Sequence, residues 1–190
     1  MEGALRSLAE WLAASGVKGM VTGGVAIVLL ARDRFTKDVD AVVWVPEDEW
    51  PAFLAHGERF GFKPRLRDPL DLARTTGILL VVHEPSGITL DVCLGCTPFE
   101  EQALARRRSI ELPGFSLPVA SPEDMVVMKS VAHRPVDMED ISYLLDRHPD
   151  LNLARVRYWL RWFARILEMP EICTDFEDLL RKARRRRRRR

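Results

Sequence analysis

The sequence predicts an α/β (α+β) fold, in which a core built on a mixed β-sheet is followed by a C-terminal helical region. Up to about residue 119, short apolar runs bounded by turn residues alternate with helical patterns. From Ser121 onward the apolar residues follow helical periodicity alone. Hydrophobic residues make up 47% of the 190-residue chain, which is enough to bury one large core or two small ones.

The elements expected before residue 120 follow from these patterns. Helices are expected over four segments, 4–14, 47–56, 68–74 and 100–106. Core strands are expected over four others, 17–21, 39–45, 79–82 and 88–94. The last two strands flank Glu84-Pro85-Ser86-Gly87, whose turn residues predict a hairpin. A second hairpin is expected over 109–119, with Pro113-Gly114 at its turn.

The helical region has a clear start. Ser121 is suited to cap a helix, Pro122 to occupy its first position, and Glu123 and Asp124 to lie in its first turn. A later helix is expected over 151–167. Its apolar stripe consists of Val156, Trp159, Leu160, Phe163 and Leu167.

The net charge of +1 conceals a strong asymmetry. Nine basic residues and no acid follow Leu180. Without these nine, the 29 basic residues of the chain fall to 20 against 28 acids, a net charge of −8. An arginine block repels itself, so we expect residues 181–190 to form a basic, disordered tail that attracts polyanions. An inert solvated end or an engineered tag is the alternative.

Asp38 and Asp40 are the first candidate site residues. They open the apolar strand expected at 39–45, and alternation along a strand places i and i+2 side chains on the same face, about 6–7 Å apart. Two carboxylates this close repel each other unless a cation lies between them, and hard oxygen ligands suit Mg²⁺ or Mn²⁺. The alternative is a solvated polar strand end.

Gly23 and Gly24 precede these acids, between an apolar strand and an apolar helix. A residue without a Cβ lets the backbone approach a phosphate closely, and the first amides of a helix favour an anion. A plain turn is the alternative, because neither the dinucleotide-binding nor the Walker glycine pattern is present.

Asp91 is the third acid, in the middle of the strand expected at 88–94. It shares a face with Thr89 and Cys93, opposite an apolar face. A carboxylate inside a strand is costly unless it binds a metal or pairs with a nearby arginine, and both outcomes stay open.

Together these residues resemble the four motifs of the nucleotidyltransferase superfamily, with its DNA polymerase beta-like fold, and in particular its AbiEii/MenT-like branch. The resemblance spans about residues 17–145. The residues that carry it are Gly23-Gly24, Arg34, Thr36, Asp38, Asp40, Asp91, Lys129 and the segment from Arg134 to Asp140. It implies transfer of a nucleoside monophosphate from an NTP to a hydroxyl, with release of pyrophosphate and with two metal ions, Mg²⁺ or Mn²⁺.

The resemblance also implies roles for individual residues. Asp38, Asp40 and Asp91 would hold the metals, and Asp91 would help to deprotonate the incoming hydroxyl. Arg134, Asp137 and Asp140 would support the site. Relatives often carry a basic residue where this chain has Thr89, which puts the nucleotide preference or the rate in question. The residues implied to bind the nucleotide are Gly23, Gly24, Arg34, Thr36, Lys37 and Lys129.

For Lys129 and Asp137, the sequence also allows interpretations in which they stabilise the fold. Lys129 follows the apolar side of its helix, so it is expected to point inward, where an ammonium requires an anionic partner. A lysine whose stem lies along the surface is the alternative. For Asp137, helix capping and an ion pair with Arg134 form the alternative.

The resulting hypothesis has three parts along the chain: a nucleotidyltransferase catalytic core over 1–119, a helical region over 120–180 that completes a cleft, and the basic tail. The expected acceptor is tRNA, another RNA or a protein, with a role as a toxin and a cognate antitoxin as partner. A small-molecule nucleotidyltransferase of the aminoglycoside type and a non-catalytic nucleic-acid-binding module are the alternatives. The absence of a signal-like N-terminus and of an apolar run near 20 residues predicts a cytoplasmic protein that does not contact membranes.

Overall fold

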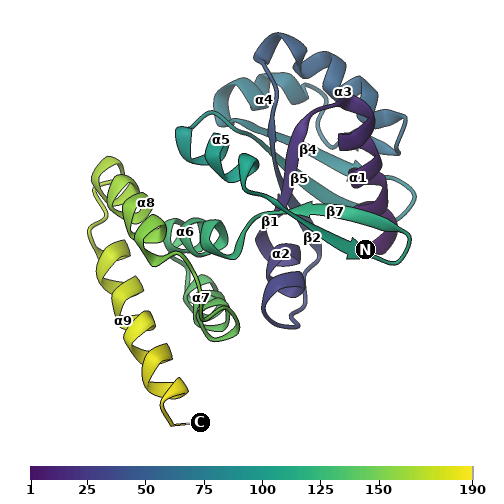
Figure 1. The fold of residues 1–190 in the computed structure, drawn as a ribbon. Helices are drawn as coiled ribbons and strands as arrows, with labels where there is room; N and C mark the ends of the chain where they lie inside the picture. Colours follow the sequence, from purple (N-terminus) through teal and green to yellow (C-terminus); the bar gives the residue numbers. More distant parts are fainter. Residues whose placement is uncertain (190) are drawn as a thin grey trace. The chain divides into compact units, whose positions relative to one another are not determined.

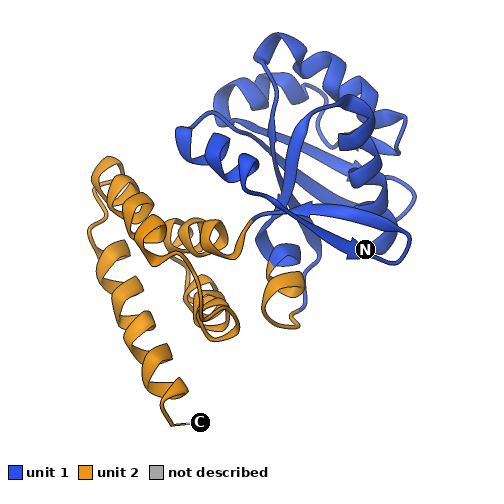
Figure 2. Ribbon diagram, in the orientation of Figure 1, with its two compact units in different colours: residues 1–26, 35–120 blue, residues 27–34, 121–190 orange. Residues whose placement is uncertain are grey.

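A computed structural model describes residues 1–189 of the chain (Figure 1). The chain forms two compact units (Figure 2). The sheet unit consists of residues 1–26 and 35–120, and the helical unit consists of residues 27–34 and of the chain from Ser121 onward. The grouping of residues 27–34 with the later helices was not expected.

The seven strands of the described residues form one mixed sheet in the sheet unit, which confirms the predicted mixed-sheet core, although the short strand at residues 62–64 was not predicted. Their order across the sheet is β3-β4-β5-β2-β1-β7-β6, with parallel pairing of β2 with β5 and of β1 with β7. Both expected hairpins are present as antiparallel pairs. The strand bounds are β1 Lys18–Thr22, β2 Asp38–Trp44, β3 Phe62–Pro64, β4 Ile78–His83, β5 Ile88–Leu94, β6 Arg108–Leu112 and β7 Phe115–Val119.

One face of this sheet is covered by two helices, α1 (Glu2–Ser15) and α3 (Trp50–Glu58). The Trp11 side chain of α1 is fully buried and stacks on Phe53 of α3, with ring centroids 4.4 Å apart. The Trp11 ring also packs against that of Phe62 on β3, with ring centroids 5.2 Å apart. Aromatic side chains contribute large buried areas, so this cluster fixes both helices to the sheet.

Three further helices and one 3-10 turn complete the connections around the sheet. Helix α5 begins with a capping box, in which the Thr97 side chain accepts from the Glu100 amide. Helix α2 follows β1 directly and passes from the sheet unit into the helical unit. The bounds are α2 Gly23–Leu30, η1 Glu47–Glu49, α4 Pro69–Thr76 and α5 Pro98–Ala105.

Four helices make up most of the helical unit. The predicted helix start is confirmed, since the Ser121 hydroxyl accepts from the Asp124 amide at 3.2 Å. Val156, Trp159 and Leu160 are buried as the apolar stripe predicts, whereas Leu167 is 43% exposed. Among the described residues, no helix is both long and apolar enough to cross a membrane. The bounds are α6 Pro122–Ala132, α7 Pro135–Arg147, α8 Leu153–Ile166 and α9 Glu171–Arg187.

The expected disordered tail is instead largely helical. Helix α9 extends to Arg187, so the expectation of disorder is wrong at least up to that residue, and Arg190 lies outside the described residues. Leu180 and Ala183 are buried, and Arg186 forms an ion pair with Asp146 of α7 at 2.9 Å. This packing offsets the repulsion between neighbouring arginines on which the prediction of disorder was based.

Candidate active site

The three acids predicted from the sequence lie on two adjacent strands of the sheet unit. Strand β2 begins at Asp38, and Asp40 follows on the same face. Strand β5 runs parallel to β2 with Asp91 directly beside Asp40 in the register. Neighbouring strands lie about 4.8 Å apart, so Asp40 and Asp91 are within reach of a shared ligand.

The acids lie on the face of the sheet opposite α1 and α3. Between them along the strands, Val39, Ala41, Leu90 and Val92 point into the core and are nearly inaccessible. Asp38 is exposed, whereas Asp40 and Asp91 are half-buried. The alternation of the two strands therefore separates an apolar core face from a face that presents carboxylates.

Helix α5 closes the other end of the acid face. The Cys93 thiol donates to Glu100 Oε1 at 3.5 Å. Burial, together with the neighbouring Glu100 carboxylate, raises the pKa of Cys93 to about 12. This thiol is therefore protonated at neutral pH and belongs to the packing under α5.

The Gly23 turn lies against the acid face. Gly23 has φ +59°, a conformation that favours glycine, and a Cβ built on it would overlap the Asp40 carboxylate. Asp40 therefore packs against the first turn of α2, where the helix amides favour negative charge. The sequence predicted a glycine turn before these acids, and the structure gives the reason for glycine at position 23.

Two neighbours hold the other carboxylates. Arg65, which follows β3, pairs with Asp91, with Nη1 3.0 Å from Oδ1. The Thr36 hydroxyl lies 3.2 Å from Asp38 Oδ1. Before Thr36, the Phe35 side chain is 80% exposed, and Lys37 Nζ lies 5.7 Å from its ring centroid. The open alternative of an arginine pair for Asp91 is thus realised by Arg65.

The donor set suits a divalent metal. Asp38, Asp40 and Asp91 supply oxygen ligands on one face, and oxygen ligands are what Mg²⁺ and Mn²⁺ prefer. In the described part of the chain, no three His, Cys, Asp or Glu side chains already form a group that could hold an ion. A metal at this face would therefore require the carboxylates to converge, with Asp91 turned from Arg65.

A second charged cluster lies in the helical unit. Lys129 of α6 is 5% exposed, and its Nζ lies 2.8 Å from Asp137 Oδ1 and 3.2 Å from Asp140 Oδ2. The prediction that Lys129 points inward is confirmed. The same contacts show that the anionic partners which an inward lysine requires are two acids of the following helix.

Both carboxylates of this cluster are fully buried and multiply paired. Asp140 accepts from Arg32 at 3.0 Å and from Arg34 at 2.5 Å. Asp137 accepts from the Arg134 side chain at 2.6 Å and belongs to the capping box that starts α7. Burial alone raises the pKa of Asp137, but hydrogen bonds from Arg134 and Lys129 and their charges outweigh it and hold the pKa below its ordinary value.

The structure thus divides the predicted site residues between the two units. The sheet unit contains Gly23, Gly24, Thr36, Lys37 and the three acids, whereas the helical unit contains Arg34, Lys129, Arg134, Asp137 and Asp140. Sequence reasoning missed Arg65 and Arg32. Arg65 lies 26 residues from Asp91 with no motif between them, so no local signal marks it.

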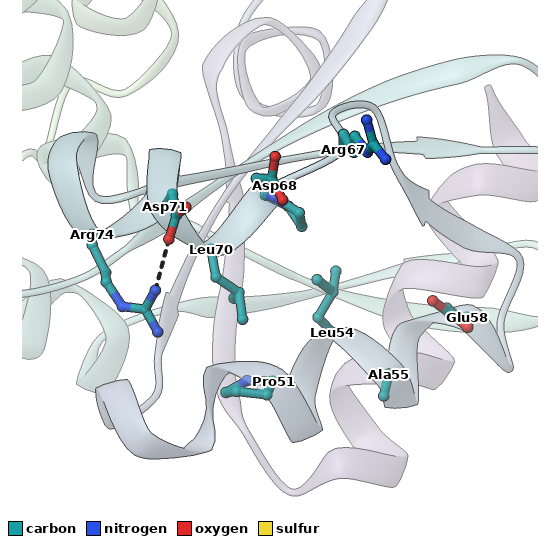
Figure 3. Close-up of a pocket in the computed structure, with 10 residues that line it drawn as sticks. Pro51, Leu54, Ala55, Glu58, Arg67, Asp68, Leu70, Asp71 and Arg74 are labelled. Atoms are coloured by element: carbon teal, nitrogen blue, oxygen red, sulfur yellow. Dashed lines mark hydrogen bonds and ion pairs between the residues drawn. The ribbon is translucent and has the colours of Figure 1, made fainter.

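A separate hollow of about 390 Å³ lies between α3 and α4 (Figure 3). Its lining includes the apolar side chains of Leu54 and Leu70, and on α4 Arg74 pairs with Asp71 at 2.9 Å. The predicted site residues do not line it.

Comparison with known families identifies the class of protein that has this fold. The class is the nucleotidyltransferases. The family model "Nucleotidyl transferase AbiEii toxin, Type IV TA system" matches residues 6–190. The chain belongs to this family, as the sequence motifs predicted, and is a nucleotidyltransferase of a toxin–antitoxin context. Comparison with curated protein sequences gives no significant match.

Solved structures of low sequence identity share the fold. An antigenic nucleotidyltransferase-like protein from Paracoccidioides brasiliensis has 18% identity and a TM-score of 0.54, with 92% of this chain and 91% of that chain covered. The solution structure of the antibiotic-resistance factor ANT(2'')-Ia has 16% identity and a TM-score of 0.59, with coverage of 90% and 95%. The lincosamide antibiotic adenylyltransferase LnuA, bound to lincomycin, has 16% identity and a TM-score of 0.55, with coverage of 76% and 96%.

Proposed function

We propose that the protein is a metal-dependent nucleotidyltransferase that transfers a nucleoside monophosphate from an NTP to an RNA hydroxyl and acts as the toxin of a toxin–antitoxin pair. The observation that carries the proposal is the register of Asp40 beside Asp91, with Asp38 on the same face. Three carboxylates on one open face are costly unless a cation binds them, and a reaction on a triphosphate supplies both the metal and the substrate.

The proposed chemistry forms a bond between the acceptor oxygen and the α-phosphorus of the NTP and breaks the bond from that phosphorus to the bridging oxygen. Pyrophosphate leaves, and the proton of the acceptor hydroxyl passes to Asp91. Mg²⁺ or Mn²⁺ held by Asp38, Asp40 and Asp91 would neutralise the triphosphate and favour in-line attack. We propose two ions, as in the superfamily that the sequence resembles.

The chain's own residues would bind and orient the triphosphate. Gly23 and Gly24 lie at the first turn of α2, where backbone amides favour phosphate oxygens. Thr36 and Lys37 lie on the segment that leads into Asp38, close enough in sequence to contact the same phosphates. Lys37 would act as a compact positive charge.

Arg65 has a place in this scheme as a competitor. Its ion pair with Asp91 is between partly exposed side chains, at 31% and 40% exposure, and such pairs contribute about 1 kcal/mol or less. Metal binding at Asp91 can therefore displace Arg65 at small cost. Arg65 would then be available to a phosphate.

Arg34 and Lys129 are also proposed to contact the nucleotide, but both already form ion pairs within the helical unit. The Arg34 side chain is 22% exposed while it pairs with Asp140, so a phosphate could share it. The Lys129 side chain is only 6% exposed and already contacts two carboxylates. Lys129 would reach an NTP only by giving up one of them, so its larger contribution is to hold α6 against α7.

The choice of RNA as acceptor rests on the nine positive charges that follow Leu180, because the rest of the chain carries a net charge of −8. Two relatives of the same fold have names that refer to antibiotics, which makes small-molecule transfer the alternative. A cognate antitoxin is the partner that the family context implies.

The test is to incubate the protein with each α-labelled NTP in turn and with one acceptor pool at a time: total cell RNA, cell protein, or a panel of aminoglycosides and lincosamides. We expect label in RNA with one preferred NTP, dependent on Mg²⁺ or Mn²⁺ and abolished by EDTA. Label only in a small molecule or in protein would overturn the RNA assignment. A protein with no metal-dependent NTP affinity would be a binding module, and the proposal would fail.

A further inference from the structure

The C-terminal end of α9 is a dense basic segment on an ordered helix. We call residues 181–189, the last two of which follow the helix, the basic end of α9. Eight of these nine residues are lysine or arginine, and none is acidic. The exception, Ala183, is buried.

One side of α9 is anchored to the rest of the helical unit. Ile172, Phe176, Leu180 and Ala183 form a buried stripe along the helix. At the basic end, Arg186 pairs with Asp146, and the Arg187 side chain donates to the Leu145 carbonyl of α7. These contacts fix the direction in which the remaining arginines point.

The opposite side presents four arginines to solvent. Arg181, Arg184, Arg185 and Arg188 follow the spacing i, i+3, i+4 and i+7, which places them on one helix face over about 10 Å. We call these four residues the basic face. All four are exposed. Arg181 pairs with Asp178 at 2.9 Å, an exposed pair of small value, and no described acid forms an ion pair with the other three.

This arrangement favours a polyanion. Like charges spaced i, i+4 destabilise a helix by about 0.2–0.5 kcal/mol per pair, and a bound row of anions would relieve that repulsion. Arginine also pairs with phosphate through two parallel hydrogen bonds. A protein partner fits less well, because the buried core of a protein interface is largely apolar or aromatic, and the basic face has no apolar or aromatic side chain.

We propose that the basic face binds the phosphate backbone of the acceptor RNA. The identity of this RNA as acceptor rests on the proposed function, whereas the binding itself needs neither metal nor NTP. The basic face would offset the repulsion between RNA and the acidic remainder of the chain.

The test compares three full-length proteins: wild type, a variant with Arg184→Gln, Arg185→Gln and Arg188→Gln, and a control with Lys18→Gln, Arg59→Gln and Arg67→Gln. The control removes the same charge from exposed positions of the sheet unit. Substitution is preferable to truncation at Leu180, because truncation would also remove the buried Ala183. Circular dichroism verifies that all three proteins are folded.

Binding of a fluorescent single-stranded RNA is measured by anisotropy across a salt series, in EDTA and without NTP. Each phosphate neutralised contributes about 0.7 to the slope of log K against log salt, so the basic-face variant should lose about 2 from the slope and bind at least about tenfold more weakly at low salt. The control should match the wild type in slope.

Equal slopes for the wild type and the basic-face variant would overturn the proposal. A polyglutamate peptide that competes as well as RNA would contradict the phosphate assignment, and a DNA strand of the same sequence that binds more tightly than RNA would contradict RNA as the partner. Since the assay contains no NTP or metal, its failure says nothing about nucleotidyl transfer. Conversely, binding retained without transfer would count against the proposed function alone.

Discussion

The two units place carboxylates in opposite environments. In the sheet unit, Asp38 is exposed and Asp40 and Asp91 are half-buried on an open face. In the helical unit, Asp137 and Asp140 are fully buried. Each unit has two aspartates close together in the sequence, Asp38 and Asp40 in one and Asp137 and Asp140 in the other. Sequence spacing alone therefore does not distinguish the more exposed pair from the buried one.

The difference lies in the cations around each group. Asp140 contacts Lys129, Arg32 and Arg34, so most of its hydrogen-bonding capacity is used within the fold. Asp91 contacts Arg65 in an exposed pair that costs little to break. A buried, fully paired acid stabilises the structure that surrounds it, whereas Asp91, whose ion pair is partly exposed, is available to a ligand.

The largest effect is expected at the sheet face. Asp38→Ala or Asp40→Ala removes a proposed metal ligand and should lower nucleotidyl transfer at least ~10³-fold, which corresponds to about 4 kcal/mol of transition-state stabilisation. The fold should persist, as measured by urea unfolding. Asp48→Ala, an exposed acid on η1, is the control and should keep full activity. Full activity in either variant would show that the substituted aspartate is not an essential metal ligand.

The next effect concerns stability in the helical unit. Lys129→Ala leaves two buried carboxylates with one cation fewer, so the free energy of unfolding should fall by ~3–5 kcal/mol. Lys63→Ala is a matched control, because Lys63 pairs with Glu84 at the same 2.8 Å but both side chains are about half exposed. The control should keep nearly the same free energy of unfolding as the wild type, because an exposed ion pair contributes little. Equal losses of unfolding free energy in the two variants would show that burial does not make the Lys129 pair more stabilising than the Lys63 pair. A fall in NTP affinity of Lys129→Ala without a loss of stability would show that Lys129 binds the nucleotide.

A smaller effect is expected from pH. Because the pKa of Asp137 is held below its ordinary value, its ionised form stabilises the folded state. That stabilisation is complete above the unfolded-state pKa of about 4 and is lost as the pH falls through the lower folded-state value. Urea unfolding from pH 7 to pH 3 should therefore show a loss of stability below about pH 4 that is reduced in Asp137→Asn. If Asp137→Asn lost as much stability below about pH 4 as the wild type, ionised Asp137 would not be what stabilises the folded state in this pH range.

The smallest effect is expected at Arg65. Arg65→Gln removes the cation that competes with a metal for Asp91, so Mn²⁺ affinity should rise about two- to fivefold, in line with the ~0.5–1 kcal/mol value of an exposed pair. Arg67→Gln removes the same charge two residues away and should leave Mn²⁺ affinity unchanged. Weaker Mn²⁺ binding in Arg65→Gln would mean that Arg65 orients Asp91 for the metal.

The sequence predicted the features that local patterns control. Alternation along β2 placed Asp38 and Asp40 on one face, and the turn residues located both hairpins. The helix start at Ser121 and the inward position of Lys129 were also predicted correctly. Each of these depends on residues within about one turn or one hairpin of each other.

Features that depend on distant residues were not predicted. The register of Asp40 beside Asp91 and the pairing of Arg65 with Asp91 join segments that are far apart in sequence. The helical continuation of α9 was missed because charge repulsion is visible in the sequence, whereas the anchoring by Asp146 of α7 is not. Tertiary contacts outweighed a local preference in that segment.

The most direct test of the contrast is Mn²⁺ binding, measured by electron paramagnetic resonance without NTP, alongside the melting temperature of each protein. Asp40→Asn should bind Mn²⁺ at least about tenfold more weakly than the wild type and melt at nearly the same temperature. Asp140→Asn should show the reverse. Its melting temperature should fall, whereas the Mn²⁺ affinity of the folded protein should equal that of the wild type. Wild-type Mn²⁺ affinity in Asp40→Asn would contradict the assignment of the sheet face as the metal site.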